Sequence, residues 1–289
     1  MKRKRSGLAG MATACLLLGG VALAQYGWDR EFRRDFDRDT LPADRAGVPD
    51  WQVDLHFKHD VFTFVRVQYD SVGRRRGWGR GGGGWRTDFP DSDLNFPFRL
   101  QQLTSMKVDP QPIILRLTDA RLFDYPFLYM IEPGALYFSD EEVVCLRRYL
   151  LNGGFLMVDD FWGDYEYQNF YEQIKRVFPE FEPVELEIDH EIFQCVYKLK
   201  EKPQVPAINT YQSYGPDVTW EPRHGGDSQT VHYRAISDKK NRMMVIICHN
   251  TDLGDGWEQE GADPGYFREY AEKKSYPMGI NIVTYAMTH

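Results

Sequence analysis

One stretch, residues 125–163, constrains the fold more than any other part of the chain. It reads YPFLYMIEPGALYFSDEEVVCLRRYLLNGGFLMVDDFWG. Its two continuously apolar runs, Phe127–Ile131 and 155–158, suit strands that are buried on both faces. Between them, Ser139 and Glu142 have the spacing of a capping box at the start of a helix. A helix between two buried strands predicts parallel strands joined by a right-handed crossover.

Other segments extend this pattern along the chain. Residues 62–69 (FTFVRVQY) alternate and predict the first strand, and residues 113–117 predict another. Residues 231–236 and 243–248 flank the turn sequence SDKKN, which indicates a hairpin. The chain is therefore predicted to be an α/β protein with a mostly parallel sheet and a C-terminal antiparallel hairpin.

Two helices in this scheme have predicted boundaries or faces. Asp91 or Asp93 is expected to cap a helix, because short acidic side chains accept bonds from the first free amides. In the helix that follows Ser139, Val144 and Leu151 are expected to widen the buried face.

The start of the chain has the pattern of a secretory signal peptide, predicted over residues 1–24. Four basic residues precede an apolar run, and Ala22-Leu23-Ala24 is an A-x-A cleavage site. An uncleaved anchor is the alternative. Residues 25–50 are rich in Arg and Asp and predict a flexible leader. Residues 51–289 then form one domain, and the protein is expected to be exported, in the periplasm or associated with the envelope.

Charge limits the partners of this domain. The formal net charge is −8, and removal of four basic residues with the signal peptide leaves −8 minus 4, or −12. An acidic protein binds nucleic acid poorly, so no nucleic acid is expected. The segment GRRRGWGRGGGGWR at 73–86 would indicate RNA binding in another context, but here it predicts a mobile loop beside the ligand edge. It has no phosphate-binding P-loop pattern.

Three cysteines remain after cleavage: Cys145, Cys195 and Cys248. An odd number does not form a complete set of disulfides, so buried inert thiols are expected. Cys248 adjoins His249, but neighbours on a strand point to opposite faces.

Asp159 and Asp160 follow the second buried strand of the central stretch. Open α/β sheets bind ligands at the carboxyl ends of their strands. The pair is therefore either a binding or metal site, or structural, with Asp160 capping the next helix and Asp159 accepting bonds from loop amides. His190 lies between two carboxylates. It is either a metal ligand or a base, or a hydrogen-bonded structural histidine that follows a capping Asp. A candidate divalent-cation set is thus Asp159, Asp160 and His190.

The loops after strand one, after Val158 and after Cys248 are expected to meet at this edge, because parallel strands deliver their loops to the same side. Carboxylates brought close together raise one another's pKa unless a cation or donor compensates. A divalent cation, an arginine such as Arg86, or a polyhydroxylated ligand such as a carbohydrate would do so. The ligand-binding candidates are Asp88, Asp93, Asn95, Asp159, Asp160, Asn250 and Asp252, with Trp85, Trp162 and Trp257 as apolar walls.

Several blocks of the sequence, in order, resemble the bacterial family of unknown function DUF4159. They are WRTDFPDSDLNFPFRLQQLT, YPFLYM, the stretch from FSDEEV to LNGGFLMVDDFWG, DHEIF, HNTDLGDGWE and GINIVTYAMTH. The resemblance covers about residues 60–289. It implies a flavodoxin-like three-layer sandwich with helices on both faces, similar to class I glutamine amidotransferases and ThuA-like proteins. It also implies an exported or membrane-attached protein, with MoxR-type ATPases and von Willebrand A-type proteins as candidate partners in an envelope complex.

The resemblance supplies no catalytic residues. Amidotransferases carry a cysteine on a sharp turn from strand to helix, whereas here the turn is Glu132-Pro133-Gly134-Ala135, without Cys or Ser. Two functions are compatible with these features. The first is a non-catalytic ligand-binding or scaffolding module of the cell envelope. The alternative is a metal- or water-dependent hydrolase that uses Asp159, Asp160 and His190 without a covalent nucleophile.

Overall fold

A computed structural model describes residues 41–53, 56, 60–71 and 84–289 of the chain. Contacts divide the chain into two units, Met1–Pro42 and Ala43–His289, and the helices and strands described below belong to the second. The predictions for the signal peptide, for most of the leader, and for most of the loop at 73–86 lie outside the described residues.

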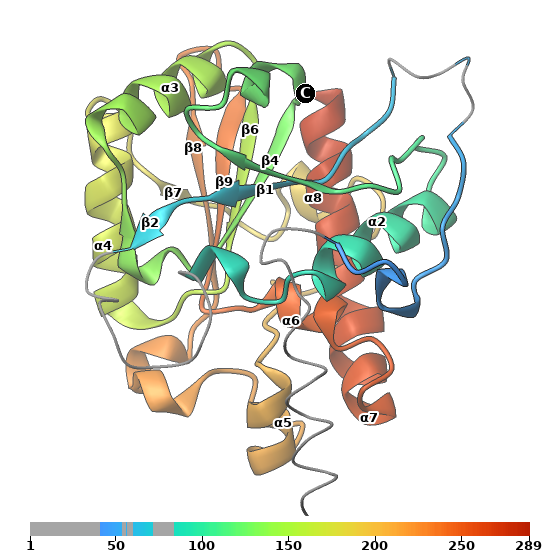
Figure 1. The fold of residues 1–289 in the computed structure, drawn as a ribbon. Helices are drawn as coiled ribbons and strands as arrows, with labels where there is room; N and C mark the ends of the chain where they lie inside the picture. Colours follow the sequence, from blue (N-terminus) through green and yellow to red (C-terminus); the bar gives the residue numbers. More distant parts are fainter. Residues whose placement is uncertain (1–40, 54–55, 57–59, 72–83) are drawn as a thin grey trace, which may run out of the picture. The chain divides into compact units, whose positions relative to one another are not determined.

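A seven-stranded sheet forms the centre of this unit, in the order β3-β1-β4-β6-β9-β8-β7 (Figure 1). The first five strands in this order are parallel, β8 is antiparallel to β9, and β7 is antiparallel to β8. The strands are β1 Val65–Gln68, β3 Ile113–Arg116, β4 Phe127–Ile131, β6 Phe155–Asp159, β7 Val184–Glu185, β8 His232–Ser237 and β9 Met243–His249. A separate antiparallel pair joins β2 Asp70–Ser71 to β5 Leu136–Tyr137. The predicted α/β class, mostly parallel sheet and antiparallel hairpin are confirmed.

Helices cover both faces of the sheet. On one side lie α3 and α4, and on the other lie α2 and α8 (Figure 1). The α-helices are α2 Asp91–Leu103, α3 Asp140–Leu151, α4 Gly163–Val177, α5 Ile208–Tyr214, α6 Leu253–Glu258, α7 Pro264–Tyr266 and α8 Tyr276–Thr288. A π-helix, η9 Phe267–Ser275, connects α7 to α8. The short 3-10 helices are η1 Arg45–Gly47, η3 Gly84–Arg86, η4 Ala120–Asp124, η5 Pro133–Ala135, η6 Glu191–Phe193, η7 Pro222–His224 and η8 Gly226–Ser228.

The strand β4 shows how one segment serves both faces. Phe127, Tyr129 and Ile131 pack in the core beneath α2 and α8, while Leu128 and Met130 pack in the core beneath α3 and α4. Successive side chains on a strand point to opposite faces, so a strand between two helical layers has to be apolar throughout. All five residues are buried.

The helix α3 begins as predicted. The Ser139 hydroxyl accepts from the amide of Glu142, and the Glu142 carboxylate accepts from the amide of Ser139. The predicted widening of its buried face is wrong, because Val144 and Leu151 are 65% and 43% exposed. Tyr149 is buried instead, and its hydroxyl donates to the carbonyl of Tyr125.

Two further boundaries differ from the prediction. The position before α2 is Pro90, which makes no side-chain cap bond, and Asp91 and Asp93 lie in the first turn of the helix. The strand β6 extends to Asp159, so this aspartate lies within the sheet rather than beyond it. Among the described residues, no helix is both long and apolar enough to cross a bilayer.

Candidate functional site

Three neighbouring parallel strands end side by side, and each is followed at once by a residue with a left-handed backbone. Glu132 follows β4 with φ 47°, Asp160 follows β6 with φ 54°, and Asn250 follows β9 with φ 60°. Residues other than glycine rarely adopt this conformation, and such strain gathers at functional sites. The backbone therefore points to the carboxyl edge of the sheet as the location of a site.

The buried side chain of Asn250 holds this edge together. Its amide oxygen accepts from the amide of Gly163 at 2.8 Å, and its amide nitrogen donates to the carbonyls of Asp227 and Thr230. Asn250 thus joins the start of α4 to the segment before β8. These bonds give this predicted ligand-binding residue a structural role.

Asp159 has a similar anchoring role. Its fully buried carboxylate accepts from the amides of Leu253 and Gly254 at 3.3 and 3.0 Å, and from the Tyr129 hydroxyl at 3.2 Å. Burial raises the pKa of Asp159 to about 7, although these donors act in the opposite direction. The side chain fixes the start of α6 against β6, which agrees with the structural alternative for this residue.

Asp160 points into a pocket. Its buried carboxylate accepts from the indole nitrogen of Trp162 at 2.9 Å. Burial raises its pKa well above the usual range, and the carboxylates of Glu132 and Asp159 raise it further. Of the sequence-predicted candidates, Asp160 and Trp162 are the two that line this pocket.

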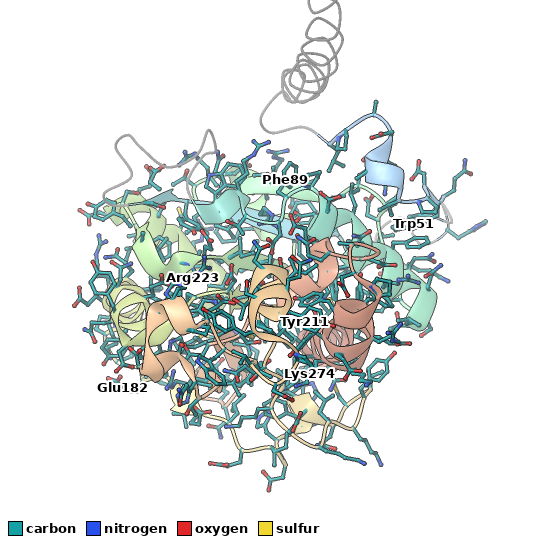
Figure 2. The ribbon with its side chains drawn as sticks, turned by 90° about the horizontal axis from the view of Figure 1, so that it is seen from below. Trp51, Phe89, Glu182, Tyr211, Arg223 and Lys274 are labelled. Atoms are coloured by element: carbon teal, nitrogen blue, oxygen red, sulfur yellow. The ribbon has the colours of Figure 1, made fainter. Side chains whose placement is uncertain are left out.

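The pocket is a cavity of about 290 Å³ at the carboxyl edge, which is the end that Figure 2 views from below. Charged groups and an aromatic ring shape it: Tyr165 is 87% exposed, and Arg223 is exposed as well. The residues that line it come from five separate segments of the chain. They are Ser71, Gly84, Glu132, Gly134, Ala135, Asp160, Trp162, Tyr165, Glu166, Arg223 and His224.

Glu166 organises the wall of this pocket. Its carboxylate accepts from the amide of Trp162 at 2.8 Å and lies 3.5 Å from Nδ1 of His224. Burial lowers the pKa of His224, and so does Arg223 beside it, which favours the neutral imidazole. A side chain at Gly134 would lie 2.6 Å from the Glu166 carboxyl group, so this glycine permits the close approach.

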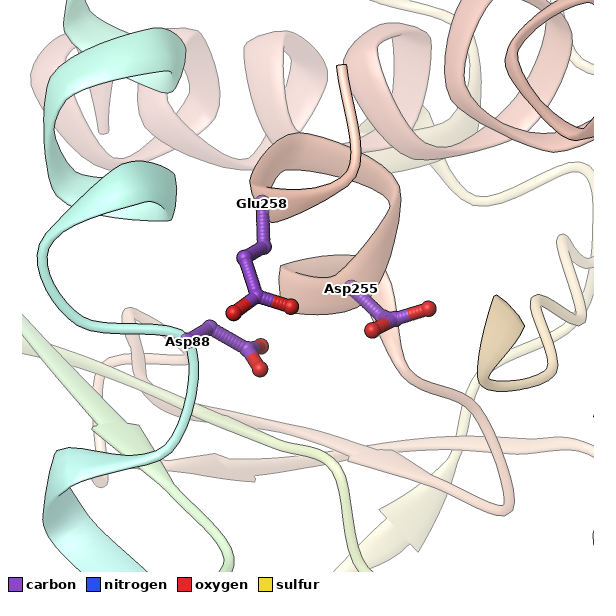
Figure 3. A group of neighbouring side chains, drawn as sticks. All are labelled: Asp88, Asp255 and Glu258. Carbon is purple, nitrogen blue, oxygen red and sulfur yellow. The ribbon is translucent and has the colours of Figure 1, made fainter. Parts of the chain in front are cut away.

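A second acidic group lies deeper, where the loop before α2 meets α6. Oxygens of Asp88, Asp255 and Glu258 lie within 4.8 Å of one another, and Figure 3 shows the three carboxylates gathered between the two elements. Burial raises the pKa of Asp88 well above its usual range, and Glu258 and Asp255 raise it further. Burial and Asp255 raise the pKa of Glu258 to about 7. Asp88 was among the sequence-predicted candidates, but Asp255 and Glu258 were not. Their spacing of three residues, which places two side chains on one face of a helix, could have identified them.

Asp93 is not part of either group. It forms a fully buried ion pair with Arg66 of β1, whose Nε lies 2.9 Å from a carboxylate oxygen of Asp93. Arg66 also donates to the backbone carbonyl of Trp85, whose side chain is buried in the core. These contacts give Asp93 and Trp85 a structural role. Arg66 was missed, although a charge within the apolar run FTFVRVQY was a signal for a buried pair.

The remaining candidates connect α6 to its neighbours. The amide nitrogen of Asn95 donates to the carbonyl of Trp257, whose ring packs 4.3 Å from that of Phe96. The Asp252 carboxylate caps α6 by accepting from the amide of Asp255 at 2.7 Å. Burial raises the pKa of Asp252, and the carboxylates of the neighbouring acidic residues raise it further.

The metal set of Asp159, Asp160 and His190 is not assembled. Among the described residues, the acidic, histidine and cysteine side chains close enough to share an ion are Asp88, Asp255 and Glu258. His190 caps η6 by accepting from the amide of Ile192, and its ring lies 5.8 Å from that of Tyr285. Tyr285 is near the end of α8, at the opposite end of the sheet from α6 (Figure 1). The structural alternative for His190 agrees with these contacts.

In the part of the chain that the structure describes, the cysteines Cys145, Cys195 and Cys248 are free thiols. Cys248 is buried and Cys145 and Cys195 are half-buried. Burial raises the pKa of Cys195 and Cys248, which disfavours the nucleophilic thiolate.

Together, the sheet topology and the acidic pocket define an α/β protein whose candidate site lies at the carboxyl ends of parallel strands, as in other open sheets. The sequence pattern of DUF4159, a domain of unknown function, matches residues 63–287, and the chain belongs to this family. No curated protein matches the chain.

Proposed function

We propose that this protein is a non-catalytic ligand-binding or scaffolding module of the bacterial cell envelope, and that its pocket takes a polyhydroxylated ligand such as a sugar. The observation that carries this proposal is the pocket itself. Its carboxylates accept hydrogen bonds from hydroxyl groups, and its exposed Tyr165 offers an aromatic face to the apolar side of a sugar ring.

The neighbourhood of Glu132 supports a binding role over acyl transfer. Glu132 follows β4 directly, has a left-handed backbone, and leads into η5. A nucleophile elbow has the same strand-to-helix geometry but carries Ser or Cys. A relationship to the amidotransferase-like sandwich, which we also propose, would therefore be one in which a carboxylate stands at the nucleophile position.

Export and partners complete the proposal. The basic start of the chain and its Ala22-Leu23-Ala24 site support export to the periplasm or envelope. The family resemblance suggests MoxR-type ATPases and von Willebrand A-type proteins as members of the same complex.

A binding experiment tests the pocket. Soluble oligosaccharides prepared from bacterial envelope glycans would be titrated into the protein by isothermal calorimetry. Tyr165→Ala should weaken binding by about 1 kcal/mol, roughly fivefold, because the ring loses its stacking contact. Tyr214→Ala is the matched control, since Tyr214 is also exposed but does not line the pocket.

Three results would contradict the proposal. The first is binding that survives both Tyr165→Ala and Glu166→Gln, and the second is the absence of binding for every oligosaccharide tested. The third is turnover, which mass spectrometry of the same mixtures would detect as cleaved oligosaccharide.

A further inference from the structure

The deeper acidic group is separate from the pocket, because none of Asp88, Asp255 and Glu258 lines it. Asp88 has φ 62° and approaches from the loop before α2, whereas Asp255 and Glu258 lie one turn apart on α6 (Figure 3). Asp88 and Asp255 are only 8% and 6% exposed. Buried carboxylates this close repel one another unless positive charge or protons lie between them.

One carboxylate oxygen in this group has no donor. Oδ2 of Asp88 is buried and makes no hydrogen bond with any described residue. Buried polar atoms are almost always paired, so an unpaired oxygen on one of three clustered carboxyl groups indicates a ligand. A side chain at Gly254 would lie 2.4 Å from this oxygen, so the glycine leaves the space that the Asp88 carboxylate occupies.

Arg66 is the positive charge that acts on Asp88, but it has no free N–H group to donate to that carboxylate. A guanidinium carries five N–H groups. In Arg66, Nε donates to Asp93, Nη1 to the carbonyls of Trp85 and Thr87, and Nη2 to Asp93 and Ser92. Its positive charge lowers the pKa of Asp88, but burial and the neighbouring carboxylates outweigh it.

The hydroxyl of Tyr129 is also committed. It lies beside the same space, 2.7 Å from where a side chain at Gly254 would begin. Its proton is donated to Asp159 at 3.2 Å. The N–H groups of Arg66 and the hydroxyl proton of Tyr129 are therefore used elsewhere.

The other two carboxylates keep capacity for a ligand. Oδ2 of Asp255 accepts from the amide of Ile208 and from the Tyr266 hydroxyl, while its Oδ1 has a single long contact of 3.5 Å from Gln259. Glu258 accepts from Gln259 through Oε2, and its carboxyl group is hydrogen-bonded to that of Asp255, which places a proton where a cation would bind. Glu258 is half-buried, so it provides a path of entry from solvent.

We propose that Asp88, Asp255 and Glu258 bind a hard divalent cation, with Ca²⁺ the best fit. An all-oxygen set of carboxylates is the ligand chemistry of Ca²⁺ and Mg²⁺ rather than of Zn²⁺ or Cu²⁺. Two oxygens on opposite sides of Ca²⁺ are about 4.6–5.2 Å apart, against about 4.2 Å for Mg²⁺. Ligand oxygens that lie within 4.8 Å of one another match the spacing of ligands around Ca²⁺ more closely than the tighter octahedron of Mg²⁺. The ion would tie the loop before α2 to α6.

Calorimetry and thermal unfolding on EDTA-treated protein test the site. CaCl₂ should bind with one ion per chain and raise the melting temperature beyond a KCl control of equal ionic strength, because an ion that binds only the folded state stabilises it. Asp88→Asn and Glu258→Gln should each weaken Ca²⁺ binding by at least about tenfold. Glu187→Gln, at an exposed carboxylate outside the group, should bind Ca²⁺ as the wild type does.

The stability of the neutralised variants Asp88→Asn and Glu258→Gln distinguishes a lost cation site from misfolding. Without added ion, Asp88→Asn should fold and melt at least as high as the EDTA-treated wild type, because it relieves repulsion between the carboxylates. Stoichiometric binding of MgCl₂ but not CaCl₂ would overturn the assignment to Ca²⁺. Absence of stoichiometric binding of either ion, or Ca²⁺ binding that both variants retain, would overturn the site.

Discussion

Acid should destabilise this protein through His249, at the end of β9. The ring is 2% exposed, its Nε2 lies 3.1 Å from the carbonyl of Gly163, and its Nδ1 lies 3.2 Å from Nη1 of Arg234. The carbonyl can only accept and the guanidinium can only donate. These contacts therefore assign a neutral tautomer with its proton on Nε2.

Protonation of this ring is strongly disfavoured in the folded state. The pKa of His249 is lowered to about 3 by burial, with the charges of Arg234 and His232 acting in the same direction and the hydrogen bond to Gly163 and the charge of Glu185 acting against them. An unfolded histidine has a pKa of about 6.5. As the pH falls below that value, His249 becomes protonated in the unfolded chain but stays neutral in the folded chain. The free energy of unfolding therefore decreases.

The magnitude follows from this difference. Each pH unit below the pKa of the unfolded histidine lowers the free energy of unfolding by about 1.4 kcal/mol. Between pH 7.5 and pH 5, the loss of unfolding free energy due to His249 is therefore about 2 kcal/mol. Glu185 contributes little in this window. Its pKa is lowered to about 2, despite burial, by His232 and Lys202, so its own contribution is lost only below the usual value of 4.5.

Urea unfolding of the wild type and of His249→Gln at pH 7.5 and pH 5 measures the effect. The variant removes the titrating group, so the wild type should lose about 2 kcal/mol relative to it over this range. In NMR spectra, the ring resonances of His249 should not shift between pH 7.5 and pH 5. A difference between the two proteins that is the same at both pH values, or a ring that titrates near pH 6.5, would refute the reasoning.

Three further predictions concern the helices, the buried pair and export. Ser139→Ala should lower the free energy of unfolding by about 1 kcal/mol, because the amide of Glu142 loses its acceptor; no change in urea unfolding would show that the cap is not stabilising. Asp93→Asn should cost about 3–5 kcal/mol, because it leaves the fully buried Arg66 without its counter-charge; a loss below about 1 kcal/mol would contradict the importance of the pair. Mature protein from the periplasm should begin at Gln25 by N-terminal sequencing, and full-length chain in the cytoplasm of the native host would contradict export.

Local sequence determined the elements of the central stretch. The apolar runs, the capping box of Ser139 and the turn at SDKKN act over a few residues, so the order of strand, helix and hairpin could be predicted without tertiary information. The convergence of loops at the carboxyl edge, where the candidate pocket lies, could also be predicted, because topology alone brings the loops after parallel strands to one side.

Which side chains face a ligand was decided by tertiary structure. Asp159 and Asn250 looked like site residues, but donors and acceptors from distant segments occupy them. Asp93 likewise pairs with Arg66, which is 27 residues away in the sequence. The hydrogen-bond partners of a polar side chain at the end of a strand depend on contacts that its sequence neighbourhood does not contain.

The two acidic groups show most clearly what the sequence predicted and what the tertiary structure decided. The sequence indicated that carboxylates would gather at this edge, and the structure sorted them into a pocket with Asp160 and a deeper group with Asp88. It also added Asp255 and Glu258, and it placed His190 at the far end of the sheet. Distances between side chains on different elements are set by how the helices pack on the sheet, and this packing depends on the whole core at once.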